Sequence, residues 1–282
     1  MSSITITPGV HEVDPAKRRQ AAALVKDGVS ISLAHELTAG PDSNAIAPME
    51  LRYLVNRADS VVTWSLDEIR LLYHGWAYSH IDALSHTGYR GQLYNRIGID
   101  HLTPTGADRL GIQALQAGIV TRGVLVDLPR MKGVPFLPAG TVFTSADLEQ
   151  WERRHRVRVD PGDVLLIRTG RWARLRVEPA WRPARETAGP HPSLAAWLKA
   201  RGVAALGGDV SNEFYPPLVA GLDDPLHELA LVALGMPLMD NLDFEALAQE
   251  AAKRSRYTFL FVAAPLRVHG GSGSPLNPLA VF

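Results

Sequence analysis

The chain has 282 residues, of which 46% are hydrophobic and 21% charged, and its 29 basic and 29 acidic residues balance to a net charge of zero. This composition is ordinary for a globular protein with a well-buried core. The balanced charge gives no reason to expect nucleic acid or an anionic membrane as a partner, so the expected partner is a small molecule. Cysteine is absent, which excludes disulfides, thiolate nucleophiles and cysteine-bound metals.

The N-terminal residues contain no basic segment followed by an apolar run, so the sequence predicts no signal peptide. No uninterrupted apolar stretch is long enough to span a bilayer. The expected location is therefore the cytoplasm.

The first half of the chain predicts short elements separated by loops. A helix is expected from Asp14 to Asp27, because an N-cap aspartate precedes a proline and a glycine follows the segment. Residues 29–33 alternate apolar and polar side chains, as a half-buried strand does. Residues 65–68 match a capping box, which indicates a helix or turn. A short helix is expected at 111–117, and the β-branched run 120–128 predicts a mostly buried strand.

The second half alternates helices and strands. Helices are expected at 144–154, 193–201, 225–235 and 244–254. Strands are expected at 164–170, 203–209 and 259–265. The segment 171–192, rich in arginine and proline, predicts a long irregular loop. Because no linker or change of composition interrupts this alternation, residues 1–282 are expected to form a single α/β domain with a mixed β-sheet flanked by helices.

Charged residues stand near the ends of the predicted buried strands. Asp127 has two interpretations: it is a functional group at the end of a strand, or its carboxylate caps a neighbouring loop. Arg168 follows an apolar run, so its guanidinium must either pair with a carboxylate or reach a cleft.

The residues best suited to bind a metal or move a proton are concentrated in the segment 73–95. They are His74, His80, Asp82 and His86. His80 and Asp82 are two residues apart, so in an extended segment their side chains lie on the same side and can share a cation. Imidazole and carboxylate suit Zn²⁺ or Mn²⁺, and an open coordination position would allow bound water to ionise near neutral pH. Such water could attack a carbonyl carbon, while a second histidine protonates the leaving group.

Ser79-His80-Ile-Asp82-Ala-Leu-Ser-His86 resembles the second half of the metal-binding signature of the cyclase family, His-x-Gly-Thr-His-x-Asp-x-Pro-x-His. These metal-dependent hydrolases include bacterial kynurenine formamidase and isatin hydrolase. Four further blocks are similar to the family: 121–127, 161–170, 226–227 and 273–278. The resemblance implies a swivelling β/β/α fold and, as commonly in the family, a homo-oligomer (dimer or tetramer).

Carried over to this chain, the resemblance implies that His80 and Asp82 bind the metal and that His86 donates and accepts the proton. His227 matches the later histidine ligand, and Asp240 falls where the family often has a glutamate. If a second metal binds, the resemblance implies that Asp82 bridges it to His227 and Asp240.

The first histidine of the family signature corresponds to Trp76 here. Three interpretations stay open: the metal keeps fewer protein ligands, His74 enters from two residues earlier, or the site is degenerate. The proline between the family's aspartate and its last histidine is also replaced, by Leu84.

The leading hypothesis is a hydrolase that uses Zn²⁺ or Mn²⁺ to cleave a C–N bond other than a peptide bond, in an arylformamide, lactam or imide. The alternatives are an ester or lactone hydrolase with the same centre, and a non-catalytic small-molecule binding protein with a degenerate metal site. A pocket walled by Trp64, Trp76, Tyr78 and the loop 172–181 would suit an aromatic or bicyclic substrate, although the same aromatics also suit core packing.

Overall fold

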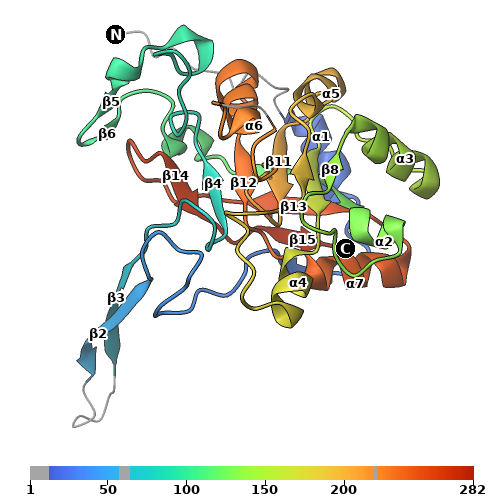
Figure 1. Ribbon diagram of the computed structural model, residues 1–282, viewed down its shortest axis with the longest axis horizontal. Helices are drawn as coiled ribbons and strands as arrows, with labels where there is room; N and C mark the ends of the chain where they lie inside the picture. The colour runs from blue at the N-terminus through green and yellow to red at the C-terminus, as the bar shows by residue number, and fades with distance from the viewer. Residues whose placement is uncertain (1–12, 57–63, 219–220) are drawn as a thin grey trace.

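The computed structural model describes residues 13–56, 64–218 and 221–282 (Figure 1). Its centre is a curled nine-stranded mixed sheet with the strand order β1-β15-β13-β7-β9-β11-β12-β4-β14. The strands are β1 (Ser30–Ser32), β4 (His80–Asp82), β7 (Ile119–Asp127), β9 (Val164–Arg168), β11 (Ala205–Gly208), β12 (Leu238–Asp240), β13 (Thr258–Ala263), β14 (Gly273–Pro275) and β15 (Leu279–Val281). The sheet thus draws its strands from both ends of the chain.

Four neighbouring strands, β7, β9, β11 and β12, run parallel, and the strands on either side of them pair antiparallel. All residues of β9 and β11 are buried. Helices on the faces of a parallel sheet cover both sides of its strands, which explains why these two strands are apolar apart from Arg168 at the end of β9. The buried strands expected at 120–128, 164–170 and 203–209 are confirmed as β7, β9 and β11.

Helices surround the sheet (Figure 1). They are α1 (Pro15–Ala22), α2 (Leu128–Lys132), α3 (Ser145–His155), α4 (Arg171–Val177), α5 (Leu194–Arg201), α6 (Pro225–His227) and α7 (Glu245–Arg254). The expected caps are present: the Asp14 carboxylate accepts the amide of Lys17, and Thr144 forms a capping box with Asp147 at the start of α3. A π-helical stretch, η4 (Glu228–Leu234), continues α6, and the 3₁₀ turns are η1 (Tyr94–Arg96), η2 (Ile99–His101) and η3 (Ile112–Leu115).

The helix or turn expected at residues 65–68 is wrong. β3 (Ser65–Arg70) is a strand that pairs antiparallel with β2 (Glu50–Asn56), and the two form an arm projecting from the body at the lower left of Figure 1. Glu68 does not reach back to cap a helix, because its carboxylate lies 2.9 Å from Arg52 on the opposite strand. The cross-strand pair replaces the capping interaction.

The loop expected at 171–192 is wrong in its first part, which forms α4. Asp209, at the end of β11, accepts hydrogen bonds from the amides of Gly170 and Arg171 at 2.7 and 3.2 Å. A carboxylate from a distant strand therefore satisfies the first amides of this helix.

Two further small sheets complete the structure: β5 (Leu102–Thr103) with β6 (Gly106–Ala107), and β8 (Val142–Phe143) with β10 (Gly189–Pro190). Among the described residues, no helix combines the length and the apolar character needed to cross a membrane. The expected α/β class with a mixed sheet flanked by helices is confirmed.

Candidate metal centre

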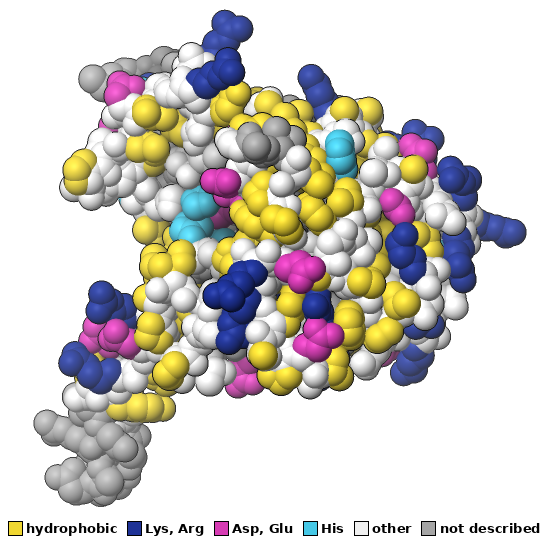
Figure 2. All heavy atoms as spheres, in the orientation of Figure 1, with side chains coloured by type: hydrophobic (Ala, Val, Ile, Leu, Met, Phe, Trp, Pro, Cys, Tyr) yellow, Lys and Arg dark blue, Asp and Glu magenta, His cyan; other side chains and the backbone are white. Residues whose placement is uncertain are grey.

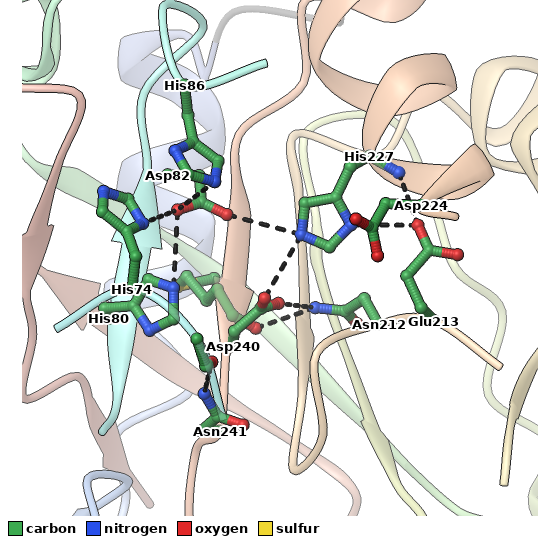
Figure 3. A network of polar contacts seen from close by, with 12 residues as sticks. His74, His80, Asp82, His86, Asn212, Glu213, Asp224, His227, Asp240 and Asn241 are labelled. Carbon is green, nitrogen blue, oxygen red and sulfur yellow. Dashed lines mark hydrogen bonds and ion pairs between the residues drawn. The ribbon is translucent and has the colours of Figure 1, made fainter. Parts of the chain in front are cut away.

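The predicted ligands meet where β4 lies between β12 and β14. His80 and Asp82 are two residues apart on β4, so both side chains lie on the same face of the sheet. Asp240 on β12 is the register partner of His80, which places a second carboxylate beside that imidazole. His227 comes from α6, and its Nε2 lies 3.3 Å from Asp240 Oδ2. The four residues predicted to bind metal, His80, Asp82, His227 and Asp240, are thus brought together (Figure 3).

Asp82 is the shared member of two groups that have the spacing of metal ligands. Its Oδ1 lies 3.0 Å from His74 Nδ1 and 3.5 Å from His80 Nε2. Its Oδ2 lies 3.6 Å from His227 Nε2, which in turn contacts Asp240. Each of the two carboxylate oxygens of Asp82 therefore faces a different group.

Each imidazole in these groups has a polar partner on the nitrogen that faces away from Asp82. His80 Nδ1 lies 2.8 Å from the carbonyl oxygen of Tyr78, and His227 Nδ1 lies 2.9 Å from Glu213 Oε1. His74 Nε2 lies 3.1 Å from Ser272 Oγ. A hydrogen bond to the distal nitrogen fixes the tautomer of a ligand histidine and presents the lone pair of the other nitrogen to the metal.

Asp82 is fully buried, and among the described residues neither of its oxygens makes a hydrogen bond of regular geometry. Burial alone would raise the pKa of this carboxyl, but the surrounding imidazoles, His80 and His86 foremost, hold the pKa well below its usual range. A buried carboxylate that faces several imidazole nitrogens is the donor arrangement that a divalent cation requires. The residues present therefore fit Zn²⁺ or Mn²⁺.

His227 and His86 have opposite proton affinities. Burial alone would lower the pKa of His227, but the carboxylate of Asp240, with Asp82 and Glu213, holds that pKa well above its ordinary value. Burial lowers the pKa of His86 to about 4, although Asp82 acts in the opposite direction. A proton on His227 thus balances the buried carboxylates, while His86 stays neutral at pH 7.

His86 lies at the edge of the centre. Its Nε2 is 3.9 Å from Asp82 Oδ1, and its side chain is 29% exposed. Its ring stacks on that of His74, with the centroids 4.0 Å apart. Figure 2 shows histidine side chains at the bottom of a hollow on the surface, at the place of β4 in Figure 1. A molecule entering the hollow would meet His86 before it reached Asp82.

The structure is consistent with the second interpretation of the Trp76 substitution, in which His74 enters from two residues earlier. His74 belongs to the ligand group, whereas the Trp76 ring packs edge-on against Tyr215 at 4.8 Å. A Cβ at position 273 would lie 2.9 Å from His74 Cε1, so Gly273 leaves the room that this imidazole occupies.

The comparisons with known proteins agree with this geometry. A family model described as "cyclase" matches residues 31–212, which is more than half of the chain. The chain belongs to the cyclase family. A search of curated proteins returned no match.

Solved structures of cyclase-like proteins extend the comparison. One described as a novel cyclase is 31% identical, with a TM-score of 0.85, and the match covers 95% of this chain and 93% of the other. Isatin hydrolase A from Ralstonia solanacearum is 21% identical, with a TM-score of 0.60 and full coverage of both chains. A potential metal-dependent hydrolase with cyclase activity is 16% identical, with a TM-score of 0.53 and coverage of 89% and 98%. The last two similarities concern the fold alone.

Other charged residues singled out from the sequence of this cyclase family member lie away from the centre or support it indirectly. Arg168 is 8% exposed and pairs with Asp127 and Glu245, each at 2.9 Å, so of its two interpretations the ion pair is the one observed. Asp127 also accepts the amide of Arg130, which makes it the N-cap of helix α2 rather than a cap on a loop.

The aromatic residues expected to wall a substrate pocket are dispersed. Tyr78 and Trp172 line a hollow together with His35 and Arg171, but that hollow contains no member of the ligand groups. Trp76 contacts Tyr215, and Trp64 is 45% exposed just before β3.

Sequence reasoning missed several residues that orient the predicted ligands. Asn212 donates from Nδ2 to Asp240 Oδ1 at 2.6 Å, and Glu213 holds both the ring and the backbone amide of His227. The hydroxyl oxygen of Ser272 contacts the ring of His74. Asn241 donates to a carbonyl oxygen of the loop that carries His74. The only signal in the sequence was position: Asn212 and Glu213 closely follow a strand that ends in Asp209.

Proposed function

We propose that residues 1–282 act as one metal-dependent hydrolase domain that cleaves the C–N bond of an arylformamide, lactam or imide. The observation that carries this proposal is the position of Asp82, a buried carboxylate placed between His74 with His80 on one side and His227 with Asp240 on the other. The isatin hydrolases that share the fold support a cyclic amide as the substrate type.

In this proposal His74, His80, Asp82, His227 and Asp240 hold Zn²⁺ or Mn²⁺. A divalent cation supplies Lewis-acid polarisation of a carbonyl and lowers the pKa of water. Asp82 belongs to both groups, so if a second cation were bound, this carboxylate would be shared between the two cations. The stoichiometry of bound metal tests that assignment.

His86 is proposed as the group that moves the proton. Burial lowers its pKa to about 4, so near pH 7 the ring is neutral and has a nitrogen free to accept a proton, although as a weak base. Its partly exposed ring stands at the mouth of the centre, within reach of both Asp82 and an incoming molecule. It then passes the proton to the leaving nitrogen, because an amine leaves only when protonated.

An ester or lactone hydrolase is the competing proposal for the same centre. An alkoxide depends less on protonation by His86 than an amine does, so the two activities respond differently to loss of this histidine. We propose that the small-molecule partner of the chain is its substrate. The dimer or tetramer and the cytoplasmic location stay predictions.

The test begins with metal-stripped protein to which Zn²⁺ or Mn²⁺ is added back. Matched arylformamide, imide, ester and lactone substrates are then assayed with the native chain and with His86→Asn. The proposal expects hydrolysis of a C–N substrate that requires the metal, with a larger loss in the variant for the amide than for the ester. No metal binding and no hydrolysis after metal addition would leave only the binding-protein interpretation.

A further inference from the structure

Loop 74–79 (residues 74–79) carries His74 at its start and leads into His80, and several of its carbonyl groups point to the same place. The carbonyl oxygen of Gly75 accepts Asn241 Nδ2 at 2.7 Å, and that of Tyr78 accepts the same nitrogen at 3.2 Å. The carbonyl oxygen of Trp76 accepts Nη2 of Arg171. Three carbonyls of one short loop are thus held by two side chains from elsewhere in the chain.

Arg171 and Asn241 also bind each other, through Arg171 Nη1 and Asn241 Oδ1. Both side chains are buried, at 2% and 0% exposure. The guanidinium offers several donors in one plane, so it can bridge an amide oxygen and a backbone carbonyl at the same time. Asn241 is the residue after Asp240, and its own carbonyl oxygen accepts Ser79 Oγ at 2.7 Å.

The two side chains are anchored to rigid elements. Arg171 is the first residue of α4, whose start is held by Asp209. Asn241 follows β12 directly and has a left-handed backbone, with φ of 56°. This conformation is uncommon for a residue other than glycine, but asparagine tolerates it better than most.

We propose that Arg171 and Asn241 form a positioning clamp that holds loop 74–79 in the conformation in which His74 and His80 both face Asp82. The clamp deepens the proposed function, because it matters for catalysis only if these histidines bind a metal. The backbone carbonyl that Arg171 binds belongs to Trp76, the residue that stands where a ligand was expected. Neither clamp residue is a member of the ligand groups.

The carbonyl of Tyr78 couples the clamp to a ligand directly. This oxygen accepts both Asn241 Nδ2 and His80 Nδ1, so loosening the clamp frees the group that orients the His80 ring. Residues that orient metal ligands from outside typically account for about 10–100-fold in metal affinity. We expect a loss of that size from removing either half of the clamp.

Two variants and a matched control test the clamp. Asn241→Asp keeps the shape and the partner of Arg171 but removes the donor to the Gly75 and Tyr78 carbonyls. Arg171→Met removes the guanidinium. Arg174→Met is the control, because Arg174 lies on the same helix and pairs with Glu178 at 2.8 Å. Arg171→Lys, which keeps the charge, replaces Arg171→Met if that variant does not fold.

Three measurements are made on each protein. Competition with a chelator gives the Zn²⁺ affinity, and X-ray absorption gives the number of imidazoles around the metal. Hydrogen exchange of the amides of loop 74–79 is followed in the metal-free protein. The clamp predicts a 10–100-fold weaker affinity, fewer imidazoles and faster exchange in the clamp variants, with the control unchanged.

The outcomes separate the clamp from the proposed function. Native affinity, imidazole number and exchange in both clamp variants would overturn the clamp while leaving the metal centre intact. If the native chain itself binds neither Zn²⁺ nor Mn²⁺, the proposed function fails, and the clamp is then tested by hydrogen exchange of the loop alone. Unchanged exchange in the clamp variants overturns the clamp, and faster exchange supports it.

Discussion

Replacing Asp82 by asparagine should abolish metal binding, whereas replacing His86 by asparagine should keep the metal and reduce turnover. Asp82 is wholly buried, and three imidazoles approach its carboxylate to between 3.0 and 3.6 Å. His86 lies at 3.9 Å, outside both ligand groups, and is partly exposed. These positions suit the different tasks proposed for the two side chains, and a pair of isosteric or near-isosteric variants can separate them.

The size of the effect follows from linkage. A cation present at 100 times its dissociation constant stabilises the folded state by about 2.7 kcal/mol. Because roughly 1 kcal/mol changes Tm by about 2–4 °C in a chain of this size, the metal-stripped native protein should gain about 5–10 °C when Zn²⁺ is added. Asp82→Asn removes the one charge shared by both groups, so this gain should disappear.

His86→Asn should keep the gain in Tm and lose about 10²–10⁴-fold in turnover of an arylformamide, the usual contribution of a positioned proton carrier. Thermal melts with and without Zn²⁺, together with initial rates, measure both quantities on the same preparations. If both variants lose the gain in Tm equally, His86 is a ligand and the division of tasks is incorrect. If neither loses it, the metal binds elsewhere.

Three further predictions concern the neighbourhood of the centre and the core. His74→Ala should weaken Zn²⁺ binding about 100-fold or more, whereas Trp76→Phe should not; equal affinities in both variants would remove His74 from the ligand set. Because the pKa of His227 is raised, its proton competes with the cation, so the apparent Zn²⁺ affinity should rise by roughly tenfold per pH unit between pH 6 and 8. A chelator competition that is flat over this range would contradict that sign. Arg168→Met should cost about 3–5 kcal/mol in urea unfolding, because it leaves buried Asp127 without its cation. The exposed Arg176→Met should cost less than about 1 kcal/mol, and similar losses in both would refute the role of burial.

The parts of the fold that the sequence predicts well are those where a local pattern determines the structure. Residues 124–126 of β7 and 164–167 of β9 are apolar because both faces of these strands are covered, and a continuous apolar run indicates this without knowledge of the partners. The common face of His80 and Asp82 follows in the same way from the two-residue period of a strand. These features need no information from distant residues.

The features that the sequence left open or predicted wrongly depend on contacts between distant segments. The place of His74 in the centre depends on the space at Gly273 and on Ser272, about 200 residues further along the chain. The start of α4 depends on Asp209, so its arginine-rich sequence reads as a loop in isolation. Residues 65–68 carry a helix signal, but the pairing of Glu68 with Arg52 on the neighbouring strand overrides it.

The antiparallel pairing of β4 with β12 explains why the two ligand groups share one carboxylate. His80 is opposite Asp240 in the register, and Asp82 lies two residues further on the same face. A shift of this register by one residue would turn the ligands of one strand to the opposite face, so the pairing is decisive for the centre. The buried charges oppose this pairing unless a proton on His227 or a cation balances them. Metal binding and correct pairing of β4 with β12 should therefore stabilise each other, and the loop that Arg171 and Asn241 hold lies directly at the start of the same strand.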